Sequence, residues 1–267
     1  MTMSVYADLL RYRELFGSLF RRDLQARYKG TIFGVAWSLA NPLLLMAIYV
    51  LVFSVLWKVT TIDHYPLFLL CGLAVWLFVS SSLTGASRSM IDYAELIKKV
   101  RFPRQLVAFS VVATQLVPFA AMLAGLIVVD AIVLPETRDT VLLSIPIAAG
   151  IVVFAAGLAL AVASVNVVFR DVEHLLAALL LPWFFLTPIL YSLEELPGGF
   201  DQYDTLVDVL HWVNPLTPPI YALRAPLFYG ELPATSDVLY LVVAAVVSLA
   251  LGAYVFGRVD DRIAVEL

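Results

Sequence analysis

Six stretches of the chain are long and apolar, and none of them contains Asp, Glu, Lys or Arg. They cover 30–57, 64–87, 105–129, 140–169, 174–193 and 238–257. A helix that crosses a hydrocarbon core of about 30 Å needs roughly 20 apolar residues, so each stretch is long enough to span. The fifth contains Pro182 and Pro188, which predicts a kinked or broken helix. The pattern predicts an all-α integral membrane protein with six transmembrane helices in a single domain, 1–267.

The segments between these stretches predict three further kinds of helix. Residues 4–29 place apolar side chains three and four apart, which is typical of an amphipathic helix in the membrane interface. The loop 88–104 is long enough for a short helix. The segment 194–237 mixes apolar and acidic residues, which indicates short re-entrant or gate helices at the outer surface.

Composition agrees with a membrane location. Hydrophobic residues make up 62% of the chain and charged residues 14%, whereas soluble domains have roughly 45–50% and about 25%. Disordered chains have low hydrophobicity and high charge, which is the opposite of this composition. The net charge of −4 argues against a nucleic-acid partner.

The basic residues predict the orientation. If the six stretches cross the membrane, 14 of the 17 Lys and Arg residues lie on the side of the N-terminus. Because cytoplasmic loops carry the excess of Lys and Arg, both termini are predicted to be cytoplasmic.

Motifs for enzymatic chemistry are missing from the sequence. It has no P-loop pattern, no H-E-x-x-H and no Cys/His cluster with metal-ligand spacing, so we expect no catalytic residue, no metal site and no cofactor in this chain. Within the apolar stretches and at their ends, only Asp130 approaches an intramembrane charge, and we expect it to be exposed at the outer end of the third stretch. Ion-coupled transporters usually bury such charges, so energy for transport would come from another chain.

Aromatic residues are frequent in the spans and allow two interpretations. They could form the interfacial belts that Trp and Tyr favour, or line a path along which sugar rings slide. The candidates for a path are Tyr49, Phe53, Trp57, Trp183, Phe184 and Tyr191.

Five fragments, in this order, resemble the permease subunits of ABC-2 type polysaccharide exporters, the group that exports O-antigen, capsule and teichoic acid. They are Arg22–Gly30, Leu96–Arg104, Asn166–Val172, Thr187–Tyr191, and Asn214–Pro215 followed by Arg224. The resemblance covers nearly the whole chain.

The resemblance implies a homodimer of this chain with two ATP-binding ABC subunits, which would bind ATP and Mg. It also implies a lipid-linked glycan as substrate, contact with membrane lipids, and a multi-pass location in the bacterial inner membrane. An ABC-2 exporter of a lipid, glycolipid or drug is the alternative. A membrane enzyme lacks the acidic or metal-binding motifs it would need, and a channel lacks charged pore rings.

The resemblance also assigns roles to residues. The residues expected to couple this chain to the ATPase are Lys98, Lys99, Arg101, Phe102, Pro103, Arg104, Arg170 and Asp171. The substrate entrance falls on Arg21, Arg22, Arg27, Tyr28 and Lys29, and the outer gate on Asn214, Pro215 and Arg224. The basic coupling cluster has a second interpretation, as a topology determinant that binds anionic lipid. Arg170 and Asp171 are expected to hold a tight turn by a local ion pair or cap.

Overall fold

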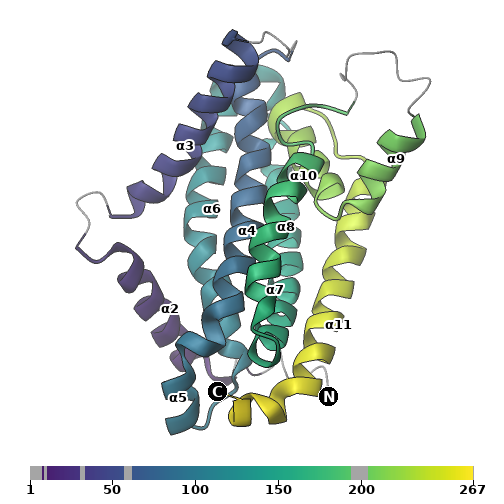
Figure 1. Ribbon diagram of the computed structural model, residues 1–267. Coiled ribbons are helices and arrows are strands. Elements are labelled where there is room, and N and C mark those ends of the chain that lie inside the picture. The colour runs from purple at the N-terminus through teal and green to yellow at the C-terminus, as the bar shows by residue number, and fades with distance from the viewer. Residues whose placement is uncertain (1–7, 9–10, 31–33, 57–61, 194–203, 267) are drawn as a thin grey trace.

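The chain forms a bundle of long helices with shorter helices at both ends (Figure 1). The computed structural model describes residues 8, 11–30, 34–56, 62–193 and 204–266, and these ranges contain helices and no strand. The helices are α2 (Arg13–Tyr28), α3 (Trp37–Tyr49), α4 (Tyr65–Asp92), α5 (Ala94–Lys99), α6 (Gln105–Val133), α7 (Ser144–Val168), α8 (Asp171–Leu186), α9 (Asp204–Val213), α10 (Thr217–Arg224) and α11 (Thr235–Glu266). Two π-helical segments, η2 (Val50–Leu56) and η6 (Ala225–Tyr229), continue α3 and α10, and short 3₁₀ turns cover Gly34–Ala36, Pro135–Thr137 and Val141–Leu143.

Helix α4 is the centre of the bundle. It packs most extensively against α6 and α7 and also contacts α3, α8 and α10. Its inner residues, such as Leu69, Leu73 and Val75, are fully buried. The apolar stretch 64–87 therefore forms a helix that is surrounded by protein on several sides.

Helices α7 and α11 form the closest helix pair. The Cα of Gly157 faces the backbone of Ser248, and Gly252 in turn faces the carbonyl oxygen of Gly157. Small residues allow this approach, which is the usual way that helices pack tightly in lipid.

Helix α3 and η2 lean away from the bundle (Figure 1). Leu44, Leu51 and Leu56 are more than half exposed on them. An apolar surface of this kind suits lipid or another protein chain.

Within the described residues, five helices are long and apolar enough to cross a membrane. They are Leu39–Leu56, Tyr65–Asp92, Gln105–Val133, Val141–Val168 and Thr235–Asp260. The remaining predicted span, 174–193, is helical only as far as Leu186, because Thr187 adopts an extended conformation before Pro188, as residues before proline prefer. Helix α8 has 16 residues and is therefore about 24 Å long, shorter than the membrane core.

The short helices lie where the sequence predicted them. Helix α5 falls inside the loop 88–104, and α9, α10 and η6 fall inside 194–237, of which residues 194–203 lie outside the described part of the chain. Helix α2 matches most of the amphipathic helix predicted over 4–29, whose first residues are likewise outside that part. The expectation for Asp130 is wrong: this residue is fully buried rather than exposed, because the α6 helix continues past it and η3 and η6 pack at that end.

Candidate transport groove and its two ends

A groove of about 610 Å³ lies between α3, α4 and α8. Three hydroxyl side chains of α4, those of Ser80, Ser81 and Thr84, line it on one side. Tyr49 and Phe184 line it on another. The lining thus combines hydroxyl groups, which bond to polar ligands, with aromatic rings, which stack on flat ones.

The aromatic side chains of the groove form a connected cluster. The ring centroid of Phe184 lies 5.9 Å from that of Tyr49 and 5.4 Å from that of Trp76. Trp76 also meets Trp183 edge-on at 5.7 Å. Trp76 lines the groove but was not among the predicted path residues. The regular spacing of residues 73, 76, 77, 80, 81 and 84 along one face of α4 is the sequence signal that would have found it.

The other predicted path residues have different surroundings. Trp183 donates its indole N–H to Asn214 Oδ1 over 2.9 Å, and Tyr191 donates its hydroxyl to the carbonyl of Phe185 over 3.1 Å. The ring centroids of Phe53 and Tyr49 are 6.3 Å apart, but Phe53 does not line the groove. Trp57 lies outside the described residues.

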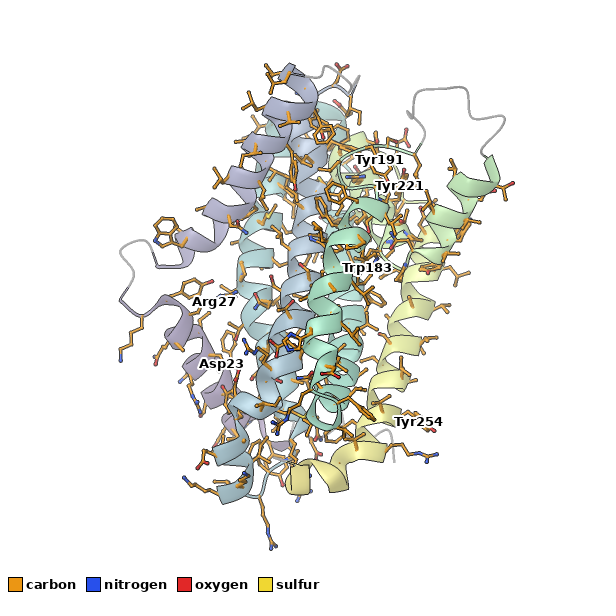
Figure 2. All side chains as sticks on the ribbon, viewed as in Figure 1. Asp23, Arg27, Trp183, Tyr191, Tyr221 and Tyr254 are labelled. Carbon is orange, nitrogen blue, oxygen red and sulfur yellow. The ribbon has the colours of Figure 1, made fainter. Side chains whose placement is uncertain are left out.

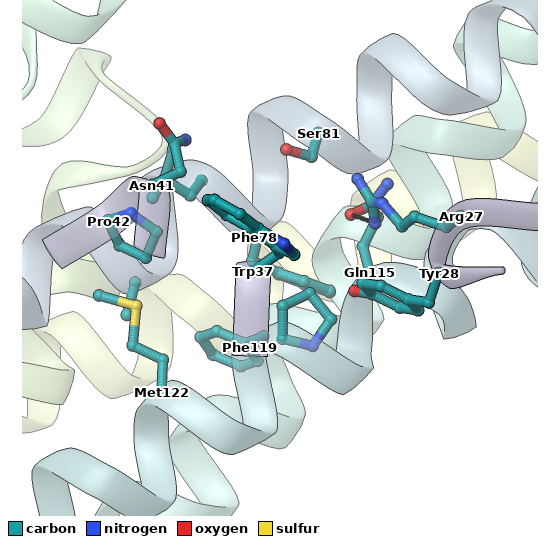
Figure 3. A pocket seen from close by; sticks show the side chains of 13 residues that line it. Arg27, Tyr28, Trp37, Asn41, Pro42, Phe78, Ser81, Gln115, Phe119 and Met122 are labelled. Carbon is teal, nitrogen blue, oxygen red and sulfur yellow. Dashed lines mark hydrogen bonds between the residues drawn. The ribbon is translucent and has the colours of Figure 1, made fainter. Parts of the chain in front are cut away.

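A second cavity, of about 300 Å³, adjoins the groove beside α2 (Figure 3). Arg27 and Gln115 line both cavities, and Arg27 Nη1 donates to Gln115 Oε1 over 2.6 Å. Tyr28 and Trp37 complete the side nearest α2 and α3. Among the residues described as lining either cavity, Arg27 carries the only formal charge.

The predicted entrance residues therefore separate into two groups. Arg27 and Tyr28 line a cavity, whereas Arg21 and Lys29 are exposed to the surroundings and do not. Arg22 stacks over the ring of Tyr93, with its guanidinium carbon 4.5 Å from the ring centroid. Figure 2 shows Asp23 and Arg27 on α2, beside the bundle.

Six of the eight predicted coupling residues lie in α5 or directly after it. Lys98, Lys99 and Arg101 are exposed, and Lys99 pairs with Glu95 one turn earlier at 2.8 Å. Phe102 and Pro103 are half-buried, and Phe102 packs against the core.

Arg104 differs from its neighbours because it is bonded within the chain. Its Nη1 donates to Asp260 Oδ1 over 2.8 Å and also to the Asp260 carbonyl. The start of α6 is thereby attached to the far end of α11.

The turn between α7 and α8 is held differently from our expectation. Arg170 and Asp171 are exposed, and the ion pairs found in the described ranges include neither of them. Asn166, which is fully buried, accepts from the backbone N–H of Glu173 over 3.0 Å and donates to the Ser87 carbonyl over 2.8 Å. The expected ion pair or cap is wrong because a buried amide from the preceding helix closes this turn.

At the opposite end of the bundle, Asn214 holds the segment that follows α8. Its Oδ1 accepts from Trp183 Nε1 and from the Leu216 N–H. Its Nδ2 donates to the Leu186 carbonyl over 3.2 Å and to Thr187 Oγ1 over 2.9 Å. Pro215 follows at the junction of α9 and α10.

Arg224 binds the next two residues of the same segment. Its Nη1 and Nη2 donate to the carbonyls of Pro188 and Ile189 over 2.6 and 2.9 Å, and its guanidinium lies 3.6 Å from the centroid of Phe68. The side chain is 1% exposed. It fits because Gly72 leaves the space, since a Cβ there would lie 2.7 Å from Arg224 Nη2. The predicted gate residues Asn214 and Arg224 thus meet on one non-helical segment.

The five membrane-length apolar helices of the described residues define a multi-pass helical membrane protein, with a partly polar groove between α3, α4 and α8. Residues 14–228 match the ABC-2 type transporter family, and the chain belongs to that family. Members of this family are transport subunits whose ATPase activity resides in a separate subunit.

Curated relatives match nearly the whole chain. It is 33% identical to the O-antigen export system permease protein RfbA of Myxococcus xanthus, over 93% of this chain and 94% of the relative. It is 31% identical to a protein of the same name from Klebsiella pneumoniae, over 99% of both chains. A second Klebsiella pneumoniae protein of that name is 30% identical over 94% of each chain.

Proposed function

We propose that this chain is the membrane-spanning subunit of an ATP-driven exporter that moves a lipid-linked polysaccharide, of the O-antigen or teichoic-acid kind, out of the cytoplasm. The observation that carries the proposal is the match, over at least 93% of the chain, to relatives named for O-antigen export. The mixed hydroxyl and aromatic lining of the groove supports a sugar substrate.

The orientation follows from the arrangement of the ends. Helices α2 and α5 and the end of α11 lie at one end of the bundle, and α9 and α10 lie at the other (Figure 1). The end with α2 and α5 carries Arg21, Arg22, Lys98 and Lys99, so it is the cytoplasmic end by the positive-inside rule. Helix α8 and the buried segment after it, which includes Ile189 and Leu190, would supply the sixth crossing.

Two copies of this chain would enclose the path. The groove lies between α3, α4 and α8. Thr84 and Ser80 donate to carbonyls of their own helix, over 2.8 and 3.5 Å, but hydroxyl side chains of membrane helices favour contacts with other helices over lipid. A second copy seated against α3 and α8 would cover the hydroxyl groups of Ser80, Ser81 and Thr84. Two ATP-binding subunits would bind from the cytoplasm at α5, where Lys98 and Arg101 are exposed.

The export cycle begins at the cavity beside α2. The phosphate of the lipid carrier binds Arg27 in place of Gln115, because arginine recognises phosphate by charge-assisted hydrogen bonds. ATP-driven closure of the partner subunits moves α5 and α2, and the glycan enters the groove. It passes along Tyr49 and Phe184 toward the outer gate.

An exporter of a lipid, glycolipid or drug remains the second candidate, favoured by the apolar cavity of about 230 Å³ between α3, α4 and α6. Deleting the gene separates the two functions. Loss of surface polysaccharide, with lipid-linked glycan accumulating inside the cell, is the expected result. Restoration by the wild-type gene is the control, and unchanged surface polysaccharide would refute the proposal.

One substitution in the groove tests the path itself. Ser81→Phe places a large ring in the groove, so we expect export to fall at least fivefold while the protein still reaches the membrane. Ala250→Phe places the same ring on the exposed face of α11, outside the groove, and should export normally. Equal export by the two variants would exclude the groove as the path.

A further inference from the structure

The face of α2 that packs on the bundle changes character along its length. Leu19, Asp23 and Arg27 are spaced four residues apart and so lie on one stripe of the helix. Leu19 is buried in the core, whereas Asp23 and Arg27 make hydrogen bonds to other helices. The end of α2 nearest the cavities is therefore attached by directional polar contacts rather than by apolar packing.

Asp23 is bonded to two different elements. Its Oδ2 accepts the hydroxyl of Ser110 on α6 over 3.0 Å, and its Oδ1 accepts the hydroxyl of Tyr93. Burial raises the pKa of the Tyr93 hydroxyl, and the bond to Asp23 raises that pKa further, so the phenol stays protonated and remains the donor. The guanidinium of Arg22 stacks on a face of the Tyr93 ring.

Tyr93 lies at the junction of α4 and α5, and its backbone N–H donates to the Ser89 carbonyl of α4 over 3.1 Å. The Tyr93 carbonyl accepts the N–H groups of Leu96 and Ile97, over 3.0 and 2.9 Å, and so starts α5. The side chain is 6% exposed and has little room to turn independently. A displacement of α5 therefore carries the phenol hydroxyl with it.

Arg27 lies one turn beyond Asp23 on the same rigid helix. Its partner Gln115 lies on α6, five residues after Ser110. A movement of Asp23 relative to α6 therefore changes the Arg27–Gln115 contact, which separates the two cavities.

We propose that Asp23 is the positioning residue through which α5 moves α2 and so opens the Arg27–Gln115 contact. The bond from Tyr93 to Asp23, together with the Arg22 guanidinium stacked on the Tyr93 ring, forms the clamp. This inference rests on the proposed ATP-driven export. Ser110 holds the same carboxylate to α6 and plays no part in the transmission.

The two hydroxyl groups on Asp23 provide a matched pair of variants. Tyr93→Phe removes the bond to α5 and keeps the ring under Arg22, whereas Ser110→Ala removes the bond to α6 and keeps Tyr93. The assay is hydrogen–deuterium exchange of the full complex with its ATPase, in lipid nanodiscs, with and without ATP trapped by vanadate. The segments compared are α2 (Arg13–Tyr28) and α5 (Ala94–Lys99).

In the wild type and in Ser110→Ala, ATP is expected to change exchange at least threefold in both helices. In Tyr93→Phe only α5 is expected to respond, and export should fall at least fivefold while the complex still assembles. An α2 response in Tyr93→Phe equal to that of Ser110→Ala would overturn the clamp alone. A wild type in which neither helix responds would overturn the clamp together with ATP-driven function. If Tyr93→Phe does not assemble, Asp23→Ala, which removes both hydroxyl bonds, is measured in its place with the same expected result.

Discussion

Replacing Gly157 by alanine is expected to force α7 and α11 apart. The added Cβ would lie 2.3 Å from the carbonyl carbon of Ser248 and 2.5 Å from the nitrogen of Leu249. Ordinary contacts between such atoms are about 3.5 Å, so the backbones must separate locally by about 1 Å. Neither atom belongs to a flexible side chain, and no rotamer change relieves the contact.

The change in the free energy of unfolding caused by Gly157→Ala is the sum of two opposing contributions. Overpacking in a tight core destabilises by about 1–3 kcal/mol, and a clash with backbone belongs at the upper end. Removing a glycine from a helix interior returns up to about 1 kcal/mol. The net loss at Gly157 is about 2 kcal/mol, which lowers the melting midpoint of a chain of this size by roughly 4–8 °C.

The assay is the thermal midpoint of the purified protein in detergent, followed by size-exclusion chromatography after heating. Gly125→Ala is the matched control, because Gly125 also lies within a membrane helix but nothing occupies the space around its Cβ position. We expect Gly125→Ala to leave the midpoint unchanged or to raise it slightly. Midpoints of the two variants within 1 °C of each other would refute the close packing at Gly157.

Two further predictions concern the ends of the bundle. Asn214→Ala removes a hydrogen-bond partner from the Trp183 indole N–H, the Leu216 N–H and the Leu186 carbonyl, while Thr187 Oγ1 keeps its bond to the Trp183 carbonyl. Since each unsatisfied buried group costs about 1–3 kcal/mol, we expect the free energy of unfolding to fall by roughly 3 kcal/mol or more, seen as a lower thermal midpoint, and a fall below about 1 kcal/mol would contradict the hydrogen-bond network. Arg101→Glu and Arg104→Glu should both reduce export. Of these two variants, only Arg104→Glu should be partly rescued by Asp260→Arg, because Arg104 is the one that pairs with Asp260. Rescue of Arg101→Glu by Asp260→Arg would argue against a role of Arg101 at the ATPase.

The helices could be predicted from the sequence because their signals are local. Apolar length alone identified the spans that became α4, α6, α7 and α11, although α4, α6 and α11 continue beyond their apolar stretches, as α11 does to Glu266. Of the two prolines that predicted a broken fifth span, Pro188 marks the end of the helix because it forces Thr187 out of it, whereas Pro182 lies within α8.

The contacts of the site could not be predicted in the same way, because they join distant segments. Asn166 and Asn214 occur in recognisable motifs, but their partners lie as far away as Ser87 and Leu186. The pair Arg170–Asp171 was expected to bond because its charges are adjacent in sequence, yet adjacent helical residues point in different directions. Asp130 was expected at the surface because it ends an apolar run, whereas the packing of η6 against α6 buries it.

The placement of charge explains how a polymer could move through this protein without being held. Arg224 is the most deeply buried cation in the described part of the chain, but the carbonyls of Pro188 and Ile189 and the ring of Phe68 occupy it, so it holds the outer segment rather than substrate. Arg27 therefore supplies the formal charge available along the described cavities, and it lies at their α2 end. Beyond it the groove presents the hydroxyl groups of α4, the rings of Tyr49, Trp76 and Phe184, and aliphatic side chains such as those of Leu73 and Leu180. None of these carries a charge. In the proposed exporter, a strong site at one end followed by weak and repeated contacts would retain the phosphate of the lipid carrier while the glycan slides, and the ATP-binding partner would supply the force for that movement.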